Sequence, residues 1–146
     1  MTYSTIDSNF LVLMTADCLS DIVVINRVLG KRIPGFREVW VNDGEELLDY
    51  LERVGKFTDP LSSPEPNLVL LADSQSATSG LRTLRIAARR GYPRRIPFIF
   101  LSENAAEDDE RFAQQLGARF LLPQPIDKLR FDDQLSALKE LRRRAA

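Results

Sequence analysis

The chain has 146 residues, of which 44% are hydrophobic and 28% charged, the profile of one globular domain large enough to bury a core. Twenty basic residues stand against 21 acidic ones, so the net charge of −1 gives no overall attraction to nucleic acid or membrane. The absence of histidine excludes imidazole acid–base catalysis and imidazole metal ligands. The single cysteine, Cys18, cannot form an internal disulfide, which favours a reducing cytoplasm, and no apolar run is long enough to predict a membrane span.

Short apolar runs alternate with longer amphipathic stretches five times along the chain. The apolar runs are too short for stable helices and are typical of buried strands. They predict strands at 10–14, 37–41, 67–72, 96–101 and 120–122. The amphipathic stretches predict helices at about 19–29, 45–54, 80–90, 107–116 and 127–144, and 55–66 is predicted as a loop.

Several residues predict where these helices begin, end and face the core. Gly30 suits the end of the first helix, and Ser20 or Asp17 could cap its start. The predicted inward faces consist of Ile22, Val23, Ile25, Asn26 and Leu29 in the first helix, Leu47, Leu48 and Leu51 in the second, and Leu129, Leu135, Leu138 and Leu141 in the last. Phe131 lies off the leucine spacing of that last helix.

Strand–helix alternation with short connections predicts an α/β domain with a parallel sheet, right-handed crossovers and helices on both faces. The run 67–72 is the most apolar, so we expect it to be the central strand. In such sheets the functional site lies at the carboxyl ends of the strands. The positions to consider are therefore 15–17, 72–76, 102–104 and 123–125.

Five motifs lie at these places and between them, in a fixed order. They are Leu-Met-Thr-Ala-Asp at 13–17, Asp-Gly-Glu-Glu-Leu-Leu at 43–48, the segment 66–80 ending in Gly80, Ile-Pro-Phe-Ile-Phe-Leu-Ser at 96–102, and Gly-Ala-Arg-Phe-Leu-Leu-Pro-Gln-Pro at 117–125. Together they resemble the receiver domain of two-component response regulators, in particular the stand-alone receivers found beside bacterial phytochromes. The resemblance covers about 10–141 and implies one receiver domain, 1–146, with a flavodoxin-like (βα)5 sheet in the order 2-1-3-4-5.

Receivers of this kind carry a phosphorylation site, and most of its positions are substituted here. In register, Ala72 stands where the family has its nucleophilic aspartate, Gln124 where it has its lysine, and Ala16 at the first of two acids. Asp17 keeps the second acid and Ser102 keeps the hydroxyl. One remaining carboxylate is a poor Mg²⁺ site, so we expect no cofactor, with Asp17 as a residual metal candidate or a helix cap.

Asp73 offers an alternative to this degenerate pocket. A one-residue bulge in the third strand could turn Asp73 into the site, where it would replace the missing nucleophile. Without a bulge the side chain points away, because successive strand residues face opposite sides of a sheet. The spacing from Pro66 to Ala72 and from Ala72 to Gly80 matches the family without a gap, which argues against the bulge.

Two features near the last strand follow from the same resemblance. The peptide Gln124-Pro125 is expected to be cis, as the family's Lys-Pro is, with an ordinary turn as the alternative. Leu121 stands where the family often has an aromatic switch residue, and Phe120 should face the other side of the sheet.

The implied function is a phosphorylation-independent interaction module in two-component signalling, not an enzyme. Its expected partners are a sensor kinase or another signalling protein, and a second copy bound through the fourth helix, fifth strand and fifth helix. A nucleic-acid-associated role is the competing hypothesis, because six arginines (Arg82, Arg85, Arg89, Arg90, Arg94 and Arg95) and the segment 142–144 are basic. The near-zero net charge favours a solvated helix face instead.

Overall fold

The computed structural model describes residues 9–15, 18–73, 80–103 and 107–141. Its centre is a five-stranded sheet in the order β2-β1-β3-β4-β5, in which every neighbouring pair is parallel. The strands are β1 (Leu11–Thr15), β2 (Arg37–Trp40), β3 (Leu68–Ala72), β4 (Phe98–Ser102) and β5 (Phe120–Pro123). The predicted α/β fold and its strand order are confirmed.

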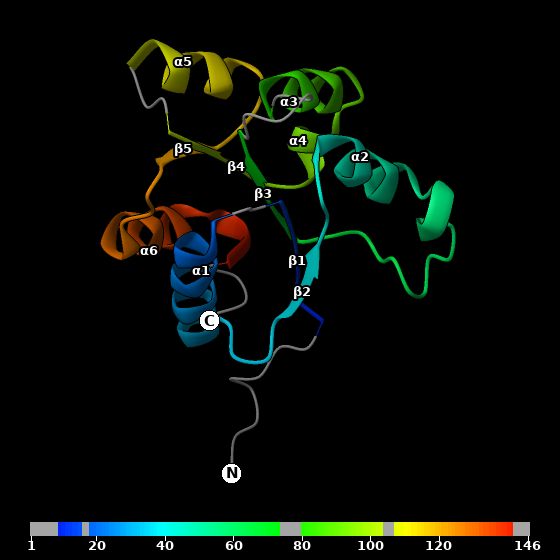
Figure 1. The fold of residues 1–146 in the computed structure, drawn as a ribbon, viewed down its shortest axis with the longest axis horizontal. Helices are drawn as coiled ribbons and strands as arrows, with labels where there is room; N and C mark the ends of the chain where they lie inside the picture. Colours follow the sequence, from blue (N-terminus) through cyan, green and yellow to red (C-terminus); the bar gives the residue numbers. More distant parts are fainter. Residues whose placement is uncertain (1–8, 16–17, 74–79, 104–106, 142–146) are drawn as a thin grey trace.

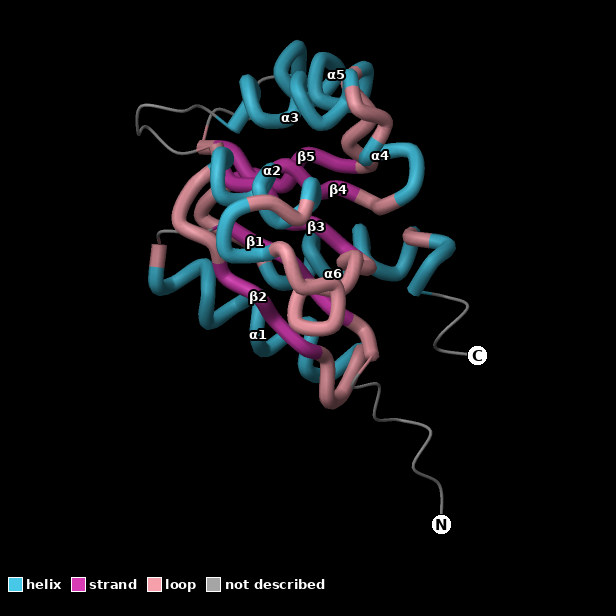
Figure 2. Tube along the Cα trace, turned by 90° about the vertical axis from the view of Figure 1, so that its right-hand side faces the viewer, coloured by secondary structure: helices cyan, strands magenta, loops and turns pink. Residues whose placement is uncertain are grey.

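Helices cover both faces of this sheet (Figure 1). They are α1 (Leu19–Arg32), α2 (Gly44–Glu52), α3 (Gly80–Arg89), α4 (Tyr92–Arg95), α5 (Glu107–Gln115) and α6 (Lys128–Ala137), with a 3-10 turn, η1 (Gly55–Phe57). Helices α1 and α6 pack on one face, and α2, α3 and α5 on the other. Figure 2 shows the same layers from the side, with the sheet between α1 on one side and α3 and α5 on the other.

The core consists of two apolar clusters, one on each face of the sheet. Alternate residues of each inner strand enter opposite clusters: Leu68, Leu70 and Ala72 pack toward α1 and α6, whereas Val69 and Leu71 pack toward α2 and α3. All five residues of β1, β3 and β4 are buried. A strand buried on both faces has no polar side to alternate with, which explains the continuous apolar runs in the sequence.

Helix α1 begins at Leu19 as predicted, but it ends later than predicted and without the predicted N-cap. It continues through Gly30 to Arg32, because Val28, Leu29 and Ile33 are buried and hold the last turn on the sheet, whereas Gly30 is exposed with no heavy atom near its missing side chain. The predicted inward position of Val23 is wrong, since its side chain is 51% exposed. Cys18 occupies the N-cap without a side-chain cap, so Ser20 does not cap the helix, and Asp17 lies outside the described residues.

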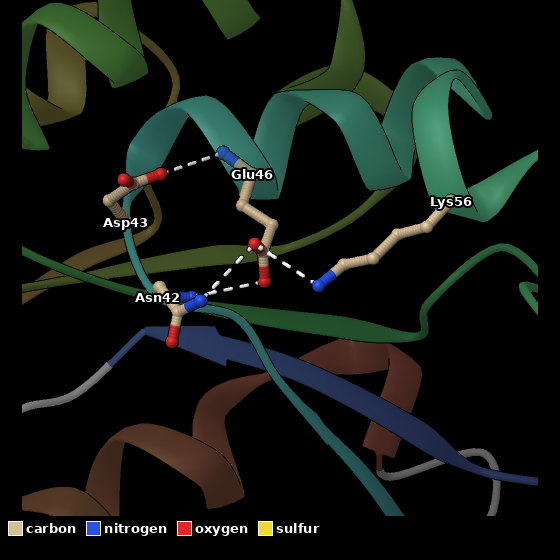
Figure 3. A network of polar contacts seen from close by, with 4 residues as sticks. All are labelled: Asn42, Asp43, Glu46 and Lys56. Atoms are coloured by element: carbon tan, nitrogen blue, oxygen red, sulfur yellow. Dashed lines mark hydrogen bonds and ion pairs between the residues drawn. The ribbon is translucent and has the colours of Figure 1, made fainter.

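Helix α2 begins at a cap that the sequence motif 43–48 indicates. The Asp43 carboxylate accepts a hydrogen bond from the Glu46 N–H at 2.8 Å, as expected of an N-cap aspartate. The Glu46 carboxylate in turn accepts from Asn42 and pairs with Lys56 of η1 at 3.3 Å (Figure 3). Leu47 and Leu48 are buried as predicted, whereas Leu51 is only partly buried.

Two short elements, η1 and α4, lie outside the predicted helices and strands. The turn η1 lies inside the predicted loop 55–66, and α4 follows α3 after Gly91, whose φ of 79° favours glycine. Pro93 lies in the first turn of α4, where its missing N–H leaves no helical bond unmade. The extra helix means that the fourth and fifth helices of the predicted numbering correspond to α5 and α6.

The last helix is shorter than predicted. Helix α6 ends at Ala137, Leu138 has an extended backbone, and the chain is helical again at 139–141, where the described residues end. Phe131, Leu135, Leu138 and Leu141 are buried, but the predicted inward position of Leu129 is wrong, since 68% of it is exposed. Phe131 and Leu135, four residues apart, form the buried face of α6, and the break at Leu138 re-aims the residues that follow.

Candidate functional site

The carboxyl ends of β1, β3, β4 and β5 lie along one edge of the sheet. Thr15, Ala72 and Ser102 end three of these strands, and each is at most 6% exposed. The Thr15 hydroxyl accepts a hydrogen bond from the backbone N–H of Ala72 at 3.0 Å, which ties the ends of β1 and β3 together. This edge includes the point where the strand order reverses, the usual ligand-binding place of such a sheet.

Ala72 occupies the centre of this edge. Its register is continuous on both sides of β3, with Leu71 opposite Thr15 and Ala72 opposite Leu101. Its methyl group belongs to the apolar cluster that faces α1 and α6. A methyl group can neither attack phosphorus nor bind a cation, so this position contributes no reactive atom.

Asp73 follows Ala72, and its carboxylate is bound at the start of α3. Its N–H continues the ladder to the Leu101 carbonyl at 2.7 Å, and β3 has no bulge between Leu68 and Ala72. Its half-buried carboxylate accepts a hydrogen bond at 2.9 Å from the N–H of Gly80, the first residue of α3. A Cβ at Gly80 would lie 2.6 Å from the Ala72 carbonyl oxygen, so glycine permits this close approach. The Asp73 carboxylate therefore serves the start of α3.

Gln124 makes the most informative contact of the edge. Its side-chain Nε2 donates a hydrogen bond to Asp21 Oδ2 at 2.9 Å, and its backbone N–H donates to the Ser102 carbonyl at 2.9 Å. The other oxygen of Asp21 accepts from the backbone N–H of Ile126 at 3.0 Å. Asp21 is only 2% exposed. The amide that stands in place of the family's lysine is thus bound to a buried carboxylate of α1.

The sequence analysis did not single out Asp21. Its partners lie 103 and 105 residues away along the chain, so no local motif reports the contact. A signal was present in the helical spacing: Asp21, Ile25 and Leu29 recur every four residues and are all buried. An acid in the middle of an inward helix face predicts a buried hydrogen-bonding role.

The remaining predicted site residues are only partly described. Ser102 is buried at the end of β4, and its carbonyl holds the backbone of Gln124. Ala16 and Asp17 lie outside the described residues, so the proposed residual metal ligand stays a prediction. In the part of the chain that the structure describes, no group of three or more acidic or cysteine side chains lies close enough together to hold a metal ion.

Two expectations about the last strand are confirmed. The Gln124-Pro125 peptide is cis. Leu121 packs in the cluster facing α2, α3 and α5, whereas Phe120 packs against the opposite cluster. The aromatic ring therefore lies on the other face of the sheet from the position of the family's switch residue.

The arginine strip on α3 and α4 is partly neutralised by protein groups. Among its members, Arg90 binds Glu52 and Arg95 binds Glu65, both at 2.7 Å, and Arg85 lies 5.3 Å from the Phe112 ring centroid. A phosphate backbone would have to compete with these contacts. The segment 142–144 lies outside the described residues. The pairing favours the solvated-face interpretation over a nucleic-acid interface.

An exposed apolar strip lies on α1, close to the site. Leu19 is 74% exposed and Val23 is 51% exposed, one helical turn apart on the same side of the helix. Asp21, between them in sequence, points to the opposite, buried side. No helix among the described residues is long and apolar enough to cross a membrane.

No protein-family model and no curated protein matches the chain by sequence. Its fold is similar to that of several solved response regulators. A regulator in red light signalling of R. palustris is 23% identical over 94% of this chain and 96% of its own, with a TM-score of 0.74.

Two bacteriophytochrome response regulators are also similar. RtBRR is 23% identical over 90% of this chain and 77% of its own, with a TM-score of 0.73. AtBRR is 25% identical over 87% of this chain and 90% of its own, with a TM-score of 0.68. At these levels of identity the likeness concerns the fold. The chain has the three-dimensional fold of a response regulator receiver, built around a strand edge that carries alanine at position 72 and glutamine at position 124.

Proposed function

We propose that the chain is a non-catalytic signalling module of the receiver type that works without phosphorylation of its third strand. The observation that carries the proposal is the Gln124–Asp21 hydrogen bond at 2.9 Å, at the end of a sheet whose central strand ends in Ala72. The amide at the lysine position is bound to the protein itself and brings no charge for a phosphoryl group.

Transfer of a phosphoryl group to protein requires a nucleophile and compensation for the negative charge of the transferred group. Ala72 has no nucleophilic atom. The nearest carboxylate along the strand, that of Asp73, bonds to the first turn of α3. These contacts support a structural role for the residues at this edge of the sheet, without phosphoryl transfer.

The proposed partners are a sensor kinase or another signalling protein. The similar structures carry names that place them in red light signalling and beside bacteriophytochromes. The exposed apolar strip of Leu19 and Val23 supports a protein partner, because apolar side chains gain free energy when a partner removes them from water.

The test of phosphorylation independence is treatment with acetyl phosphate and Mg²⁺, followed by separation on a phosphate-affinity gel. We expect no retarded band for the natural sequence. The matched variant is Asp73→Ala, which removes the only carboxylate next to Ala72 along β3. A retarded band that disappears in this variant would contradict the proposal and identify Asp73 as a phosphate acceptor.

A homodimer through α5, β5 and α6 is the second part of the proposal. Leu129 supports it, since this side chain of α6 is 68% exposed, whereas Phe131 and Leu135 are already buried in the monomer. Such a contact would be isologous, as most homodimer contacts are. Light scattering over a concentration series should give about twice the monomer mass, and Leu129→Ser should lower it. A monomer at high micromolar concentration would contradict this assembly.

A further inference from the structure

The Asp21 carboxylate is the most deeply buried acid among the described residues, and both of its oxygens are bound by one short segment. Gln124 and Ile126 bind it at 2.9 and 3.0 Å from the connection between β5 and α6. Both donors are neutral groups, a side-chain amide and a backbone N–H. The described residues form no ion pair with Asp21.

A buried carboxylate that loses a hydrogen-bond donor is left with a desolvated charge, which is far more costly than the loss of an exposed contact. A shift of α1 therefore either carries Gln124 and Ile126 along with Asp21 or breaks these hydrogen bonds at that cost. At the opposite end of α1, Val28 and Leu29 pack in the same apolar cluster as Leu135 of α6. The polar contact at that end is the weaker one. There Arg32 binds Asp132 at 2.6 Å, and both side chains are about one-third or more exposed.

The first two turns of α1 thus have two different sides. The outer side carries Leu19 and Val23, and the inner side carries Asp21. Because a helix is rigid over this length, a displacement on the outer side reaches the carboxylate on the inner side. Among the described residues, the hydrogen bonds of this carboxylate run to Gln124 and Ile126, which lie four and two residues before Lys128, the first residue of α6.

We infer that Asp21 is a coupling residue, through which the position of α1 sets the position of the β5–α6 connection and of α6. A movement of α1, in place of a phosphoryl group at the strand ends, would then be the event that starts the change. The mechanical coupling is independent of the proposed function, but its use as a signal rests on it. Coupling between two elements is reciprocal, so a change in the connection must also reach α1.

The test is amide hydrogen exchange on the full chain. Gln124→Ala removes one of the two bonds and leaves the Ile126 N–H on Asp21. We expect exchange to rise about 10- to 100-fold at Ile126, in α6 and, reciprocally, in the first turns of α1, the factor that corresponds to one hydrogen bond to a charged group. Gln114→Ala is the matched control, because it removes the same side chain from the exposed surface of α5.

A second variant, Asp21→Asn, keeps the shape and removes the charge, and Asp132→Asn is its control on the exposed pair. We expect faster exchange at Ile126 and in α6 for Asp21→Asn, with β3 unchanged. A rise confined to the segment 124–126, with α1 and α6 unaffected, would overturn the coupling. Equal rises throughout the chain, β3 included, would also overturn it, since they report global destabilisation.

The phosphate-affinity assay on the same proteins separates this inference from the proposed function. Normal coupling together with a retarded band would overturn the proposed function alone. The absence of coupling together with the absence of a band would overturn the device and leave phosphorylation independence standing.

Discussion

Replacement of Asp73 by alanine tests whether this carboxylate belongs to the fold or to a reactive pocket. Its Oδ1 accepts the N–H of Gly80 at 2.9 Å, one of the N–H groups at the start of α3 that have no partner within the helix. Loss of such a cap costs about 1 kcal/mol, and the loss of a negative charge near a helix N-terminus costs up to about 1 kcal/mol more. We expect Asp73→Ala to lower the free energy of unfolding by about 1–2 kcal/mol.

Urea unfolding followed by circular dichroism measures this difference. With a slope of roughly 1–3 kcal/mol per molar urea, the midpoint should fall by about 0.3–2 M. Asp73→Asn keeps an acceptor oxygen at the same place, so it should recover most of the loss. If Asp73→Ala unfolds at the same midpoint as the natural sequence, the carboxylate does not cap α3. The Asp73 carboxylate would then be available for phosphate chemistry.

Two further substitutions probe packing and pH dependence. A Cβ at Gly44 would lie 1.8 Å from the hydroxyl oxygen of Thr83, which is fully buried, so Gly44→Ala should destabilise by about 3 kcal/mol in urea unfolding. The destabilisation by Gly44→Ala should be smaller in a Thr83→Ala background. If the effects of the two substitutions on the free energy of unfolding simply add, the two side chains do not clash. The hydrogen bond from Arg32 holds the pKa of Asp132 below its ordinary value, so this pair stabilises the fold above about pH 4 and the contribution is lost as the pH falls through the lowered pKa. Asp132→Asn should therefore cost less than about 1 kcal/mol at pH 7 and progressively less as the pH falls below about 4, as followed by thermal unfolding against pH.

The sheet could be predicted from the sequence because both of its faces are covered. Strands such as β3 are buried at every residue, and a short run of five apolar residues has few other solutions. Strand order followed from the resemblance, which rests on motifs spread over the chain. The predicted strand ends differ from the observed ones by a residue or two. The predicted strand 96–101, for example, begins only at Phe98, because Pro97 has no N–H to donate to a neighbouring strand.

Helix ends depended on tertiary contacts that no local rule contains. Glycine costs about 1 kcal/mol inside a helix, and this cost is smaller than the gain from burying Val28, Leu29 and Ile33 in the continuation of α1. In the last helix the leucine spacing predicted one continuous face. The break at Leu138 allows a different set, with Phe131 in place of Leu129, to reach the core.

The substituted positions at the strand ends could be found from the sequence. The hydrogen bond between Gln124 and Asp21 could not. The four-residue spacing of Asp21, Ile25 and Leu29 indicates an inward position for the acid, but only the folded chain brings it to Gln124. Residue types show which side chains of the family's site are substituted, here Ala72 and Gln124. The new partners of its side chains depend on burial and distance, which a sequence of one chain does not contain.

The two substitutions at the strand ends, Ala72 and Gln124, are physically consistent with each other. A lysine at position 124 would place a full positive charge beside strand ends that are at most 6% exposed, and in a weakly polar environment such a charge needs an anion nearby. With a methyl group at position 72, no carboxylate stands at that position to pair with such a charge. Asp21, which contacts position 124, already accepts the Ile126 N–H. Gln124 donates a hydrogen bond to the Asp21 carboxylate at 2.9 Å and brings no charge of its own to this edge. With no nucleophile at position 72, a neutral amide at position 124 still satisfies the buried Asp21 carboxylate, and the two hydrogen bonds of that carboxylate join α1 to the connection between β5 and α6.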